Sequence, residues 1–467
     1  MVVGEIEIGT DVLVIGSGPA GYTAAIRCGQ LGLDATLAGP QLGGVCLNLG
    51  CIPYKSLLYS LNHVLEAREA GRLGVEEKAA IDLKRAQEWK GKVIARLRNG
   101  ITRLLDASGV QALEGMCSFA SSSEAVVQGE HGSQRVRFRR AVIATGSHFR
   151  QPAGVRLDGK RAVSPYALAS IEKSPVRAAV LGGGVSGANV VSLLAKMGTE
   201  VALAYKGRSL LPWIDEDVQQ PAIKWLESNR VKIYPSASWK AAPDGSSVRI
   251  SSGGTDVDVT PDLAVFVTPQ EANTAGLNLG VTGVKLDERG FVQADDNYRT
   301  TDPSIYAIGD VLGGARNACT AYRDGASVAS VLAGKPGLPG YQAMPLTIYT
   351  EPPIACAGMT EKEAKNAGIE VVVGRSPYSA CGAATLTGHD AGFAKVVAEK
   401  GSGRILGVHI VGRDSTNLIA EGLLAIEMGA RLEDVVLTLH PHPELCEVFY
   451  DACARAAGLS TNTATKK

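Results

Sequence analysis

The pattern of apolar and polar positions repeats in two long segments of the chain. The first, DVLVIGSGPAGYTAAIRCGQLGLDATLA, begins at Asp11, and the second, RAAVLGGGVSGANVVSLLAKMGTEVALA, begins at Arg177. Each has a short apolar run, a glycine-rich turn, a stretch rich in Ala and Leu, and a second apolar run. Short apolar runs bounded by turn residues are typical of buried strands, and the Ala- and Leu-rich stretches indicate helices. The pattern therefore predicts a strand, a helix and a second strand in each segment.

Outside this repeat, the spacing of apolar residues predicts a helical region, a β-rich region and an α+β module. Leucines and charged residues recur at helical spacing over residues 57–105, and a β-rich stretch then runs to Phe138. The further elements expected are strands from Leu263, Phe393 and Leu406 and helices from Ser415 and Leu432, the last four within a module that starts at about Met344.

Composition narrows the classes of function. The 467 residues exceed what one hydrophobic core usually holds, and they are 45% hydrophobic and 20% charged with a net charge of +0. A neutral chain has no basic field to attract nucleic acid. No apolar run reaches about 18 residues, and the N-terminus carries no pattern of a targeting segment. We therefore expect no nucleic-acid partner, no membrane span and a cytoplasmic location.

Both glycine-rich turns have the G-x-G-x-x-G spacing that binds dinucleotides. In this motif the first glycine permits a sharp turn, the second lets the backbone approach a pyrophosphate, and the third lets the helix pack closely on the strand. The phosphates lie at the positive end of the helix. A single turn of this kind can be purely structural, but two in the same context predict two dinucleotides. The glycines are Gly16, Gly18 and Gly21 in the first turn and Gly182, Gly184 and Gly187 in the second.

Neither segment has the acidic residue that commonly ends the second strand and binds the adenosine ribose. Ala38 and Gly39 stand there in the first segment, and Tyr205 and Lys206 in the second. Lys206 and Arg208 suit the 2′-phosphate of NADP, so the second site is expected to bind NAD or NADP, with NADP favoured. The alternative is that both cations are solvated loop residues.

Two of the nine cysteines, Cys46 and Cys51, lie close together in the stretch GGVCLNLGCIPYK. They suit a buried structural pair, half of a metal site, or a redox pair. An ideal helix would separate their Cα atoms by roughly 8.7 Å, beyond the ~7 Å limit for a disulfide. Bridging therefore needs a distorted turn, which Gly50 can supply, and Pro53 then fits the first turn of a helix that begins near Cys51.

The chemistry of this stretch favours the redox use. A helix N-terminus and the nearby Lys55 both stabilise a thiolate, the reactive form of cysteine. A metal site would need a second pair of ligands at suitable spacing, and none accompanies this one, so no metal is predicted. Thiol exchange also needs a base that titrates near neutral pH, and HPHPELCE offers His440 and His442. On the residues alone, two histidines in a Pro-rich loop are more often surface residues.

Several motifs in one order resemble a known family: GGVCLNLGCIPYK, the two glycine turns, AVIATGS at 141–147, IYAIGD at 305–310, IYTEPP at 348–353 and HPHPELCE at 440–447. Together they resemble the dihydrolipoamide dehydrogenases of the pyridine nucleotide-disulfide oxidoreductase family. The resemblance implies an α/β fold with two Rossmann-like domains of the three-layer ββα type and an α+β C-terminal dimerisation domain. The implied domains are 1–149 (FAD-binding, first part), 150–275 (NAD(P)-binding), 276–343 (central, second part of the FAD domain) and 344–467 (dimer interface).

The same resemblance assigns the site residues. It implies that Cys46 exchanges with the substrate disulfide, that Cys51 is the thiolate beside the flavin, and that His442 is the base, oriented by Glu447. In such enzymes the base reaches the cysteine pair of the other subunit, which implies a homodimer with a shared active site. The residues assigned to FAD are Gly16, Gly18, Pro19, Ala20, Gly21, Gly43, Gly44, Val45, Lys55, Ala144, Thr145, Gly146, Gly309 and Asp310, and those assigned to NAD or NADP are Gly182, Gly184, Gly187, Lys206 and Arg208.

The chain departs from the family pattern at a few positions. Tyr54 stands in place of Ser, and Asn189 in place of a Glu that pairs with the lysine matching Lys55. Pro441, Glu444 and Cys446 replace Ala, Thr and Ser beside the base. Cys446 is either a third redox thiol or a small packing residue.

The function expected is FAD-dependent electron transfer between NAD(P)(H), the Cys46–Cys51 pair and a lipoamide-like dithiol or disulfide. One alternative is an NAD(P)H-dependent reductase of another small organic disulfide, which the departures at Tyr54 and Asn189 motivate. Another is a flavin-binding protein that has lost catalysis, against which the retained cysteines, His442 and Glu447 argue.

Overall fold

The computed structural model describes residues 7–76 and 79–462, and the chain divides into two compact units. The first unit is built from residues up to 151, 166–173 and 268–339, and the second from residues 152–165, 174–267 and 340 onward. The first unit thus combines most of the two predicted FAD-domain segments, and the second combines most of the predicted NAD(P) and interface segments. The division into four domains stays a prediction.

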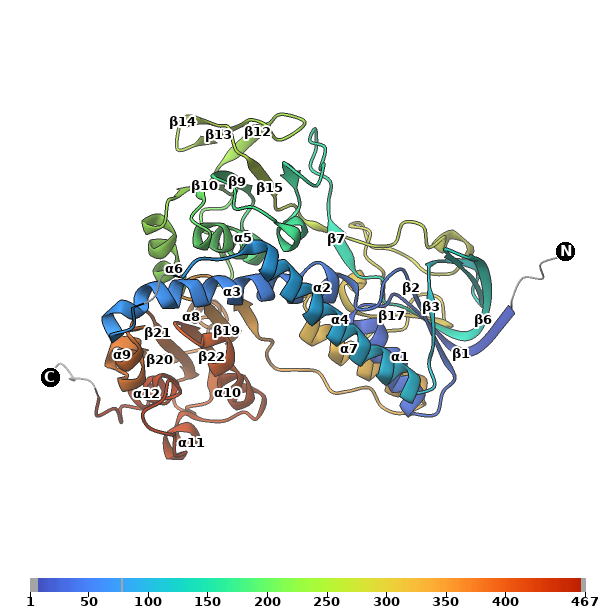
Figure 1. The fold of residues 1–467 in the computed structure, drawn as a ribbon. Coiled ribbons are helices and arrows are strands. Elements are labelled where there is room, and N and C mark those ends of the chain that lie inside the picture. Colours follow the sequence, from blue (N-terminus) through green and yellow to red (C-terminus); the bar gives the residue numbers. More distant parts are fainter. Residues whose placement is uncertain (1–6, 77–78, 463–467) are drawn as a thin grey trace. The chain divides into compact units, whose positions relative to one another are not determined.

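A seven-stranded sheet organises the first unit (Figure 1). Strand β1 (Glu7–Ile15) lies parallel to β2 (Ala35–Gly39) on one side and to β6 (Gly132–Ile143) on the other, and β17 (Ile305–Ala307) adds in parallel to β6. The long β6 also continues into an antiparallel meander. The meander consists of β4 (Met116–Ser121), β5 (Glu124–Gly129) and β6, while β3 (Gln111–Glu114) closes the other edge beside β2.

Alternate residues of β1 bury against opposite layers, because side chains of a strand point to opposite faces. Val12 and Val14 pack in a core that includes residues of helices α1 (Pro19–Gln30) and α7 (Ala318–Leu332). Leu13 and Ile15 pack with side chains of the meander, such as Phe119. Helices therefore cover one face of the sheet and β-structure the other, which confirms the predicted ββα layering.

The predicted helical region of residues 57–105 contains two α-helices, joined through a 3₁₀ turn and a loop. Helix α3 (Cys51–Glu69) runs into a 3₁₀ turn, η1 (Ala70–Leu73), and α4 (Leu83–Ala107) begins where Asp82 accepts a hydrogen bond from the backbone N–H of Arg85. In the described part of the chain, no helix has the length and apolar character needed to cross a bilayer. The other elements of this unit are α2 (Gly44–Asn48), β7 (Ser147–Phe149), η2 (Pro165–Ser170), β16 (Gln270–Ala272), η3 (Leu279–Val281) and η4 (Gly309–Leu312).

The second unit contains the second strand, helix and strand of the repeat. A five-stranded parallel sheet has the order β11-β10-β9-β15-β8, and α5 (Gly184–Lys196) connects β9 (Arg177–Leu181) to β10 (Glu200–Ala204). An antiparallel sheet of three strands, which the sequence did not suggest, is inserted before β15. The remaining elements are β8 (Ala162–Val163), α6 (Glu216–Ser228), β11 (Val231–Tyr234), β12 (Ser238–Ala241), β13 (Val248–Ser252), β14 (Thr255–Val259) and β15 (Leu263–Phe266).

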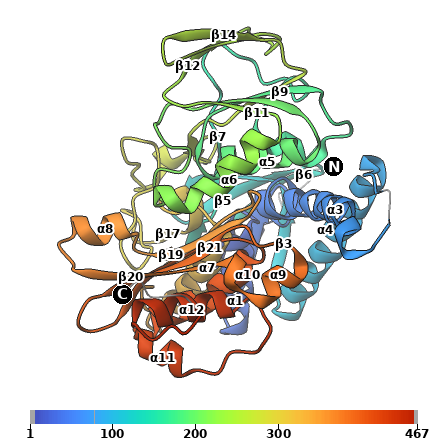
Figure 2. The ribbon, with the colours of Figure 1, turned by 90° about the vertical axis from the view of Figure 1, so that its left-hand side faces the viewer.

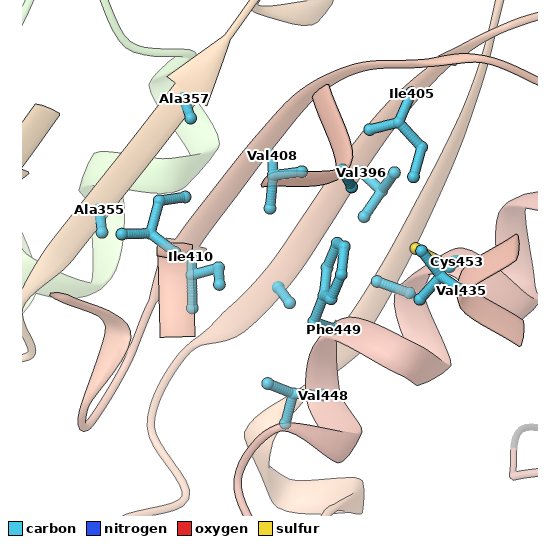
Figure 3. Close-up of a cluster of buried hydrophobic side chains, with 14 of the residues drawn as sticks. Ala355, Ala357, Val396, Ile405, Val408, Ile410, Val435, Val448, Phe449 and Cys453 are labelled. Atoms are coloured by element: carbon cyan, nitrogen blue, oxygen red, sulfur yellow. The ribbon is translucent and has the colours of Figure 1, made fainter. Parts of the chain in front are cut away.

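An antiparallel sheet of order β18-β19-β22-β21-β20 forms the C-terminal part of this unit. Helices α10 (Ser415–Glu427) and α12 (Glu447–Ala456) pack on it (Figure 2), and the ring of Phe449 points from α12 toward Val396 and Val408 in the core (Figure 3). The helix starts expected at Ser415 and Leu432 are confirmed. The other elements are β18 (Leu346–Ile348), β19 (Ile354–Gly358), α8 (Glu361–Asn366), β20 (Val371–Pro377), η5 (Tyr378–Ala380), α9 (Gly382–Thr387), β21 (Phe393–Glu399), β22 (Ile405–Val411) and α11 (Leu432–Leu437).

Two buried lysines form ion pairs inside this unit. The Nζ of Lys196 lies 2.5 Å from Glu351, and the Nζ of Lys395 lies 2.8 Å from Asp215 and 2.9 Å from Glu361. Both lysine side chains are 1% exposed. A buried charge is tolerated only with partners, so these pairs fix the residues around α5, α6 and β21.

Candidate active site

The first glycine turn lies at the edge of the sheet where β1, β6 and β17 end, since parallel strands bring their carboxyl ends together. Gly16 has a φ of +114°, and a Cβ there would lie 2.3 Å from the carbonyl oxygen of Ala144. A Cβ on Gly21 would lie 1.7 Å from the carbonyl oxygen of Gly16. Both positions therefore require glycine, and the turn packs directly against the predicted Ala144–Thr145–Gly146 segment.

The start of α1 is open to an anion. Gly18 is the N-cap and gives no side-chain hydrogen bond, Pro19 begins the helix, and no acidic residue occurs in the first turn. The next short helix, α2, lies over the same turn, because the N–H of Gly43 donates to the carbonyl of Ser17 at 2.8 Å and a Cβ on Gly44 would lie 2.6 Å from the Cα of Gly18. Free N–H groups at a helix N-terminus bind phosphate.

Asp310 lies in η4, beside the end of β17. Its carboxylate accepts a hydrogen bond from Oγ of Ser147 at 3.2 Å, and burial raises its pKa. Asp324 of α7 accepts from the N–H of Gly309 at 3.1 Å and holds this turn in place. The sequence pattern did not single out Ser147 or Asp324, although a carboxylate in a helix of small and apolar residues was a signal for such a role.

These residues fit FAD. The glycine cradle and the start of α1 suit the pyrophosphate, and Asp310 offers acceptor oxygens for a polyol. Oγ1 of Thr145 is buried and has no hydrogen-bond partner among the described residues, as expected of a group that binds a ligand. Of the other predicted residues, Ala20 lies on α1, Val45 on α2 and Lys55 on α3, and these helices surround this edge of the sheet.

The structure explains why no acidic residue ends β2. A Cβ on Gly39 would lie 2.5 Å from Oγ and 2.8 Å from the backbone nitrogen of Ser17. A real Cβ does not approach other atoms so closely, so this position cannot hold a larger side chain without moving the turn. Any recognition of the adenosine ribose in the first site must therefore come from other groups.

The cysteine pair lies at a break between two helices. Cys46 is in α2, α2 ends at Asn48, and Cys51 is the first residue of α3. Between them Gly50 has φ −111° and ψ −102°, which is not helical. The structure thus has the predicted interruption at Gly50 and the predicted helix start at Cys51, and it contains both cysteines as free thiols.

The two thiols have opposite pKa shifts. The hydrogen bond from Cys46 lowers the pKa of Cys51 to about 7, and the charge of Lys55, one turn along α3, contributes in the same direction. The hydrogen bond to Cys51 raises the pKa of Cys46, and burial adds to this. The shifts therefore favour the proton on Cys46 and the negative charge on Cys51.

Two tyrosines that the sequence did not single out lie in the same unit. The hydroxyl of Tyr22 on α1 is 2.8 Å from that of Tyr322 on α7. Burial raises the pKa of Tyr22, and the hydrogen bond to Tyr322 and the charges of both cysteines add to this shift. Tyr22 therefore stays protonated near the cysteine pair.

The second glycine turn has the same construction. Gly182 has a φ of +130°, and a Cβ there would lie 2.2 Å from the carbonyl oxygen of Val267 after β15. A Cβ on Gly187 would lie 2.4 Å from the carbonyl oxygen of Gly182. Gly184 begins α5, whose first turn has no acidic residue. The turn is therefore suited to a second pyrophosphate.

The cations expected at this site follow β10. Lys206 and Arg208 are both exposed, and Nζ of Lys206 lies 5.9 Å from the ring centroid of Trp239. Asn189 lies in α5, two residues after Gly187 of the turn. Its side-chain oxygen accepts a hydrogen bond from the N–H of Tyr349 at 2.8 Å. Asn189 therefore has a structural role in this chain.

The structure distinguishes the two histidines of the HPHPELCE stretch. His442 is 77% exposed, and its Nδ1 lies 2.9 Å from Oε1 of Glu447, the first residue of α12. Because a carboxylate only accepts, Nδ1 carries the hydrogen and Nε2 has a free lone pair. Glu447 also accepts from the N–H of Glu444 at 3.1 Å, so it fixes the loop as well as the ring.

The side chain of His440 is buried, and both of its ring nitrogens have partners. Its side chain is 7% exposed, Nδ1 is 2.9 Å from the carbonyl of Thr438, and Nε2 is 2.8 Å from Glu421. Both nitrogens are engaged, which favours a structural role. Burial raises the pKa of the neighbouring Cys446, so this thiol is poorly suited to exchange and the packing interpretation is favoured.

Comparison with known proteins identifies the family. Residues 10–325 match the pyridine nucleotide-disulphide oxidoreductase model and residues 344–453 match the dimerisation domain of that family. Dihydrolipoyl dehydrogenase of Halobacterium salinarum is 36% identical, with 99% of each chain covered, and that of Bacillus subtilis is 34% identical, with 98% covered. The fold is also that of the HOCl-induced flavoprotein disulfide reductase RclA from Escherichia coli, with a TM-score of 0.84 at 23% identity over 95% of this chain and 99% of the other.

These matches confirm the predicted class of enzyme, a flavoprotein disulfide oxidoreductase that resembles dihydrolipoyl dehydrogenase, and its cofactors, FAD and NAD or NADP. The roles assigned to single residues stay predictions. The chain belongs to the pyridine nucleotide-disulphide oxidoreductase family and carries the dimerisation domain of that family.

Proposed function

We propose that the chain oxidises a small dithiol of the dihydrolipoamide type and passes two electrons, through the Cys46–Cys51 pair and FAD, to NAD or NADP. The observation that carries the proposal is the pair of free cysteines at the break between α2 and α3, with Cys51 as the first residue of α3, one turn before Lys55. The curated relatives named dihydrolipoyl dehydrogenase support the substrate class.

The exchange step uses the oxidised form of the pair. One substrate thiolate attacks Sγ of Cys46, the bond between Cys46 and Cys51 breaks, and Cys51 leaves as a thiolate. A thiol with a pKa of about 7 is a good leaving group. The second substrate thiolate then attacks the substrate sulfur of this mixed disulfide, which closes the substrate disulfide and releases Cys46. The substrate loses two electrons and two protons, and bound FAD supplies electron transfer from the reduced pair to the nicotinamide.

His442 is the proton acceptor in this proposal. Its Nε2 takes the proton of the attacking substrate thiol, and the carboxylate of Glu447 stabilises the imidazolium through Nδ1–H. The exposed ring is accessible to a substrate that enters from outside its own unit.

A second copy of the chain completes the site. Several apolar side chains of the dimerisation domain are exposed, and Leu437 and Leu439, 82% and 97% exposed, directly precede the loop of His442. Leu424 and Met428, 62% and 75% exposed, lie one turn apart at the end of α10. Apolar surface of this kind is typical of an obligate interface, and its burial would place His442 at the boundary between two subunits.

The nicotinamide dinucleotide proposed is NADP rather than NAD. No acidic residue ends β10, and Lys206 and Arg208 follow it as exposed cations. A carboxylate at this place would accept from ribose hydroxyls, whereas cations bind a 2′-phosphate.

A second candidate is the NAD(P)H-dependent reduction of another small organic disulfide. Asn189 favours it, because an amide that binds the N–H of Tyr349 replaces the family carboxylate. Electrons would then pass from the nicotinamide, through FAD and the cysteine pair, to the substrate disulfide.

Initial rates of the purified holoprotein test both candidates. We expect reduction of NADP with dihydrolipoamide as electron donor, and slower reduction of NAD. Cys46→Ser should abolish this turnover and leave reduction of the flavin by NADPH intact. Negligible turnover of lipoamide or dihydrolipoamide with either nucleotide would reject the first candidate, and turnover of another disulfide in a panel would then establish the second.

A further inference from the structure

The loop between β10 and α6 is fixed on the second glycine turn. The N–H of Gly184 donates to the carbonyl of Leu210 at 2.9 Å, which joins the loop to the start of α5. From α6, the buried side chain of Gln219 accepts from the N–H of Leu211 and the hydroxyl of Ser209, and it donates to the carbonyls of Leu211 and Ile214. The loop is thus held from both sides.

This anchored loop presents one large aromatic side chain to the turn. Trp213 is 61% exposed, although its ring lies 3.4 Å from the point that a Cβ on Gly184 would occupy. An aromatic ring normally loses most of its exposure when it packs in a core. Here the ring rests its edge on the glycine and leaves most of its surface accessible.

The position of Gly184 in its motif shows which part of a bound dinucleotide the exposed ring of Trp213 faces. It is the second glycine of G-x-G-x-x-G, the one whose missing side chain lets a pyrophosphate approach the backbone. The adenosine ribose lies beyond the end of the second strand of such a unit, which here is β10. Trp213 belongs to the loop that follows β10, so it lies on the adenosine side of the pyrophosphate position.

We propose that Trp213 is a binding residue for the adenosine half of the nicotinamide dinucleotide, which it contacts through its exposed indole. This rests on the proposed function only in that the second turn binds a nicotinamide dinucleotide. The indole offers a flat apolar surface and one N–H donor, which suit a purine or a ribose. It adds affinity for NAD and NADP alike, whereas Lys206 and Arg208 discriminate between them.

Calorimetric titration of the holoprotein with NADP and with 2′,5′-ADP, the adenosine half alone, tests this inference. We expect Trp213→Ala to weaken the binding of both nucleotides by about tenfold, because base stacking on an aromatic side chain contributes binding energy that the variant loses. Trp213→Phe should retain most of the affinity because it keeps a ring. In the kinetics, Trp213→Ala should raise KM for the nucleotide and leave kcat close to wild type.

A matched control is Trp89→Ala, since Trp89 is 59% exposed on α4 of the other unit. The Trp89→Ala variant should bind both nucleotides with the affinity of the wild-type protein. Wild-type affinity of Trp213→Ala for 2′,5′-ADP, in a protein that binds NADP, would overturn the role of Trp213. Absence of any nucleotide binding by the wild-type protein would instead overturn the proposed function.

Discussion

Cys46 lies in the short helix α2 and Cys51 begins α3, with the break at Gly50 between them and the charge of Lys55 one turn further along α3. Two chemically identical side chains thereby acquire different reactivities. Their mutual interaction raises the pKa of Cys46 and lowers that of Cys51, and the charge of Lys55 favours the thiolate.

Removal of the donor should raise the pKa of Cys51. In the reduced protein we expect alkylation of Cys51 by iodoacetamide to have a midpoint below that of an ordinary cysteine, because its pKa is lowered. In Cys46→Ala the midpoint should move upward, since the thiolate loses its main stabilising contact. Mass spectrometry of the labelled peptide, with Cys51→Ser as the blank, measures it. An unchanged midpoint in Cys46→Ala would contradict the hydrogen-bond explanation.

His442 and Glu447 should act as one unit in proton transfer. We expect His442→Ala to lower kcat/KM for the dithiol by about 10²–10⁴-fold, the usual range for loss of a general base. Glu447→Ala should cause a smaller loss and a changed pH profile, because the ring loses the carboxylate that orients it. His440→Gln is the control, since both its nitrogens are engaged elsewhere. It should lower Tm and leave the pH profile unchanged, and a shifted profile would mean that the roles of the histidines are reversed.

The sequence predicted those elements that are determined by residues close together in the chain. The glycine turns, the break at Gly50, the helix starts at Ser415 and Leu432 and the strand that begins at Phe393 all follow from residue type and spacing. Contacts between distant segments left no such signal. The pairs of Lys395 with Asp215 and of Asp324 with Gly309 join residues far apart in sequence, and nothing in either stretch shows which residue will be its partner.

The missing acid of the first segment is a further example. The sequence shows that Ala38 and Gly39 stand in its place. The reason Gly39 has no side chain is Ser17, whose backbone lies where that side chain would begin. Likewise, the sequence presents Trp213 as a loop residue, and only the fold brings it onto Gly184. Such close approaches depend on how two turns pack, which the local pattern of residues does not encode.

A side chain at Gly39 should weaken FAD binding. We expect Gly39→Ala to lower the flavin content of the purified protein and its Tm, because the new Cβ would displace Ser17 in the turn predicted to bind the phosphates. Gly39→Asp, which introduces the usual acid, should be worse rather than better. Gly100→Ala in α4 is the control, since its Cβ would meet nothing within 4 Å, and it should be neutral or stabilising by about 0.5–1 kcal/mol. Normal flavin content in Gly39→Asp would show that the turn can move.

Loss of the buried Lys395 should destabilise the protein in a pH-dependent way. Burial opposes ionisation of Asp215, but the hydrogen bonds from Lys395 and from the backbone N–H of Glu361, together with the charge of Lys395, lower its pKa overall. Hydrogen bonds from Lys365 and Lys395 lower the pKa of Glu361. In the wild type these groups stabilise the fold above their unfolded pKa values, and this contribution is lost as the pH falls through the lowered values. Lys395→Met leaves the carboxylates without their buried cation, which typically costs about 3–5 kcal/mol.

In the Lys395→Met variant, the effect of falling pH on stability has the opposite sign. Its buried carboxylates have raised pKa values, so protonation relieves their repulsion, and the difference in Tm between wild type and variant should narrow as the pH falls from 7 to about 5. Lys400→Met is the control, because Lys400 is 59% exposed and its ion pair with Glu370 is at the surface. It should change stability by less than about 0.5 kcal/mol. A difference in Tm that stays constant with pH would contradict the charge argument.

The shared active site can be tested by mixing two inactive homodimers. If Cys46 of one subunit works with His442 of the other, a heterodimer of Cys46→Ser and His442→Ala chains has one site with both defects and one intact site. After exchange of subunits, half of the dimers are heterodimers, and about a quarter of wild-type dithiol oxidation should return. If the cysteine pair and the base belonged to one subunit, every site would lack one of them and no activity would return. Leu437→Glu in both chains should prevent the recovery, because a charge on this apolar surface opposes the association on which it depends.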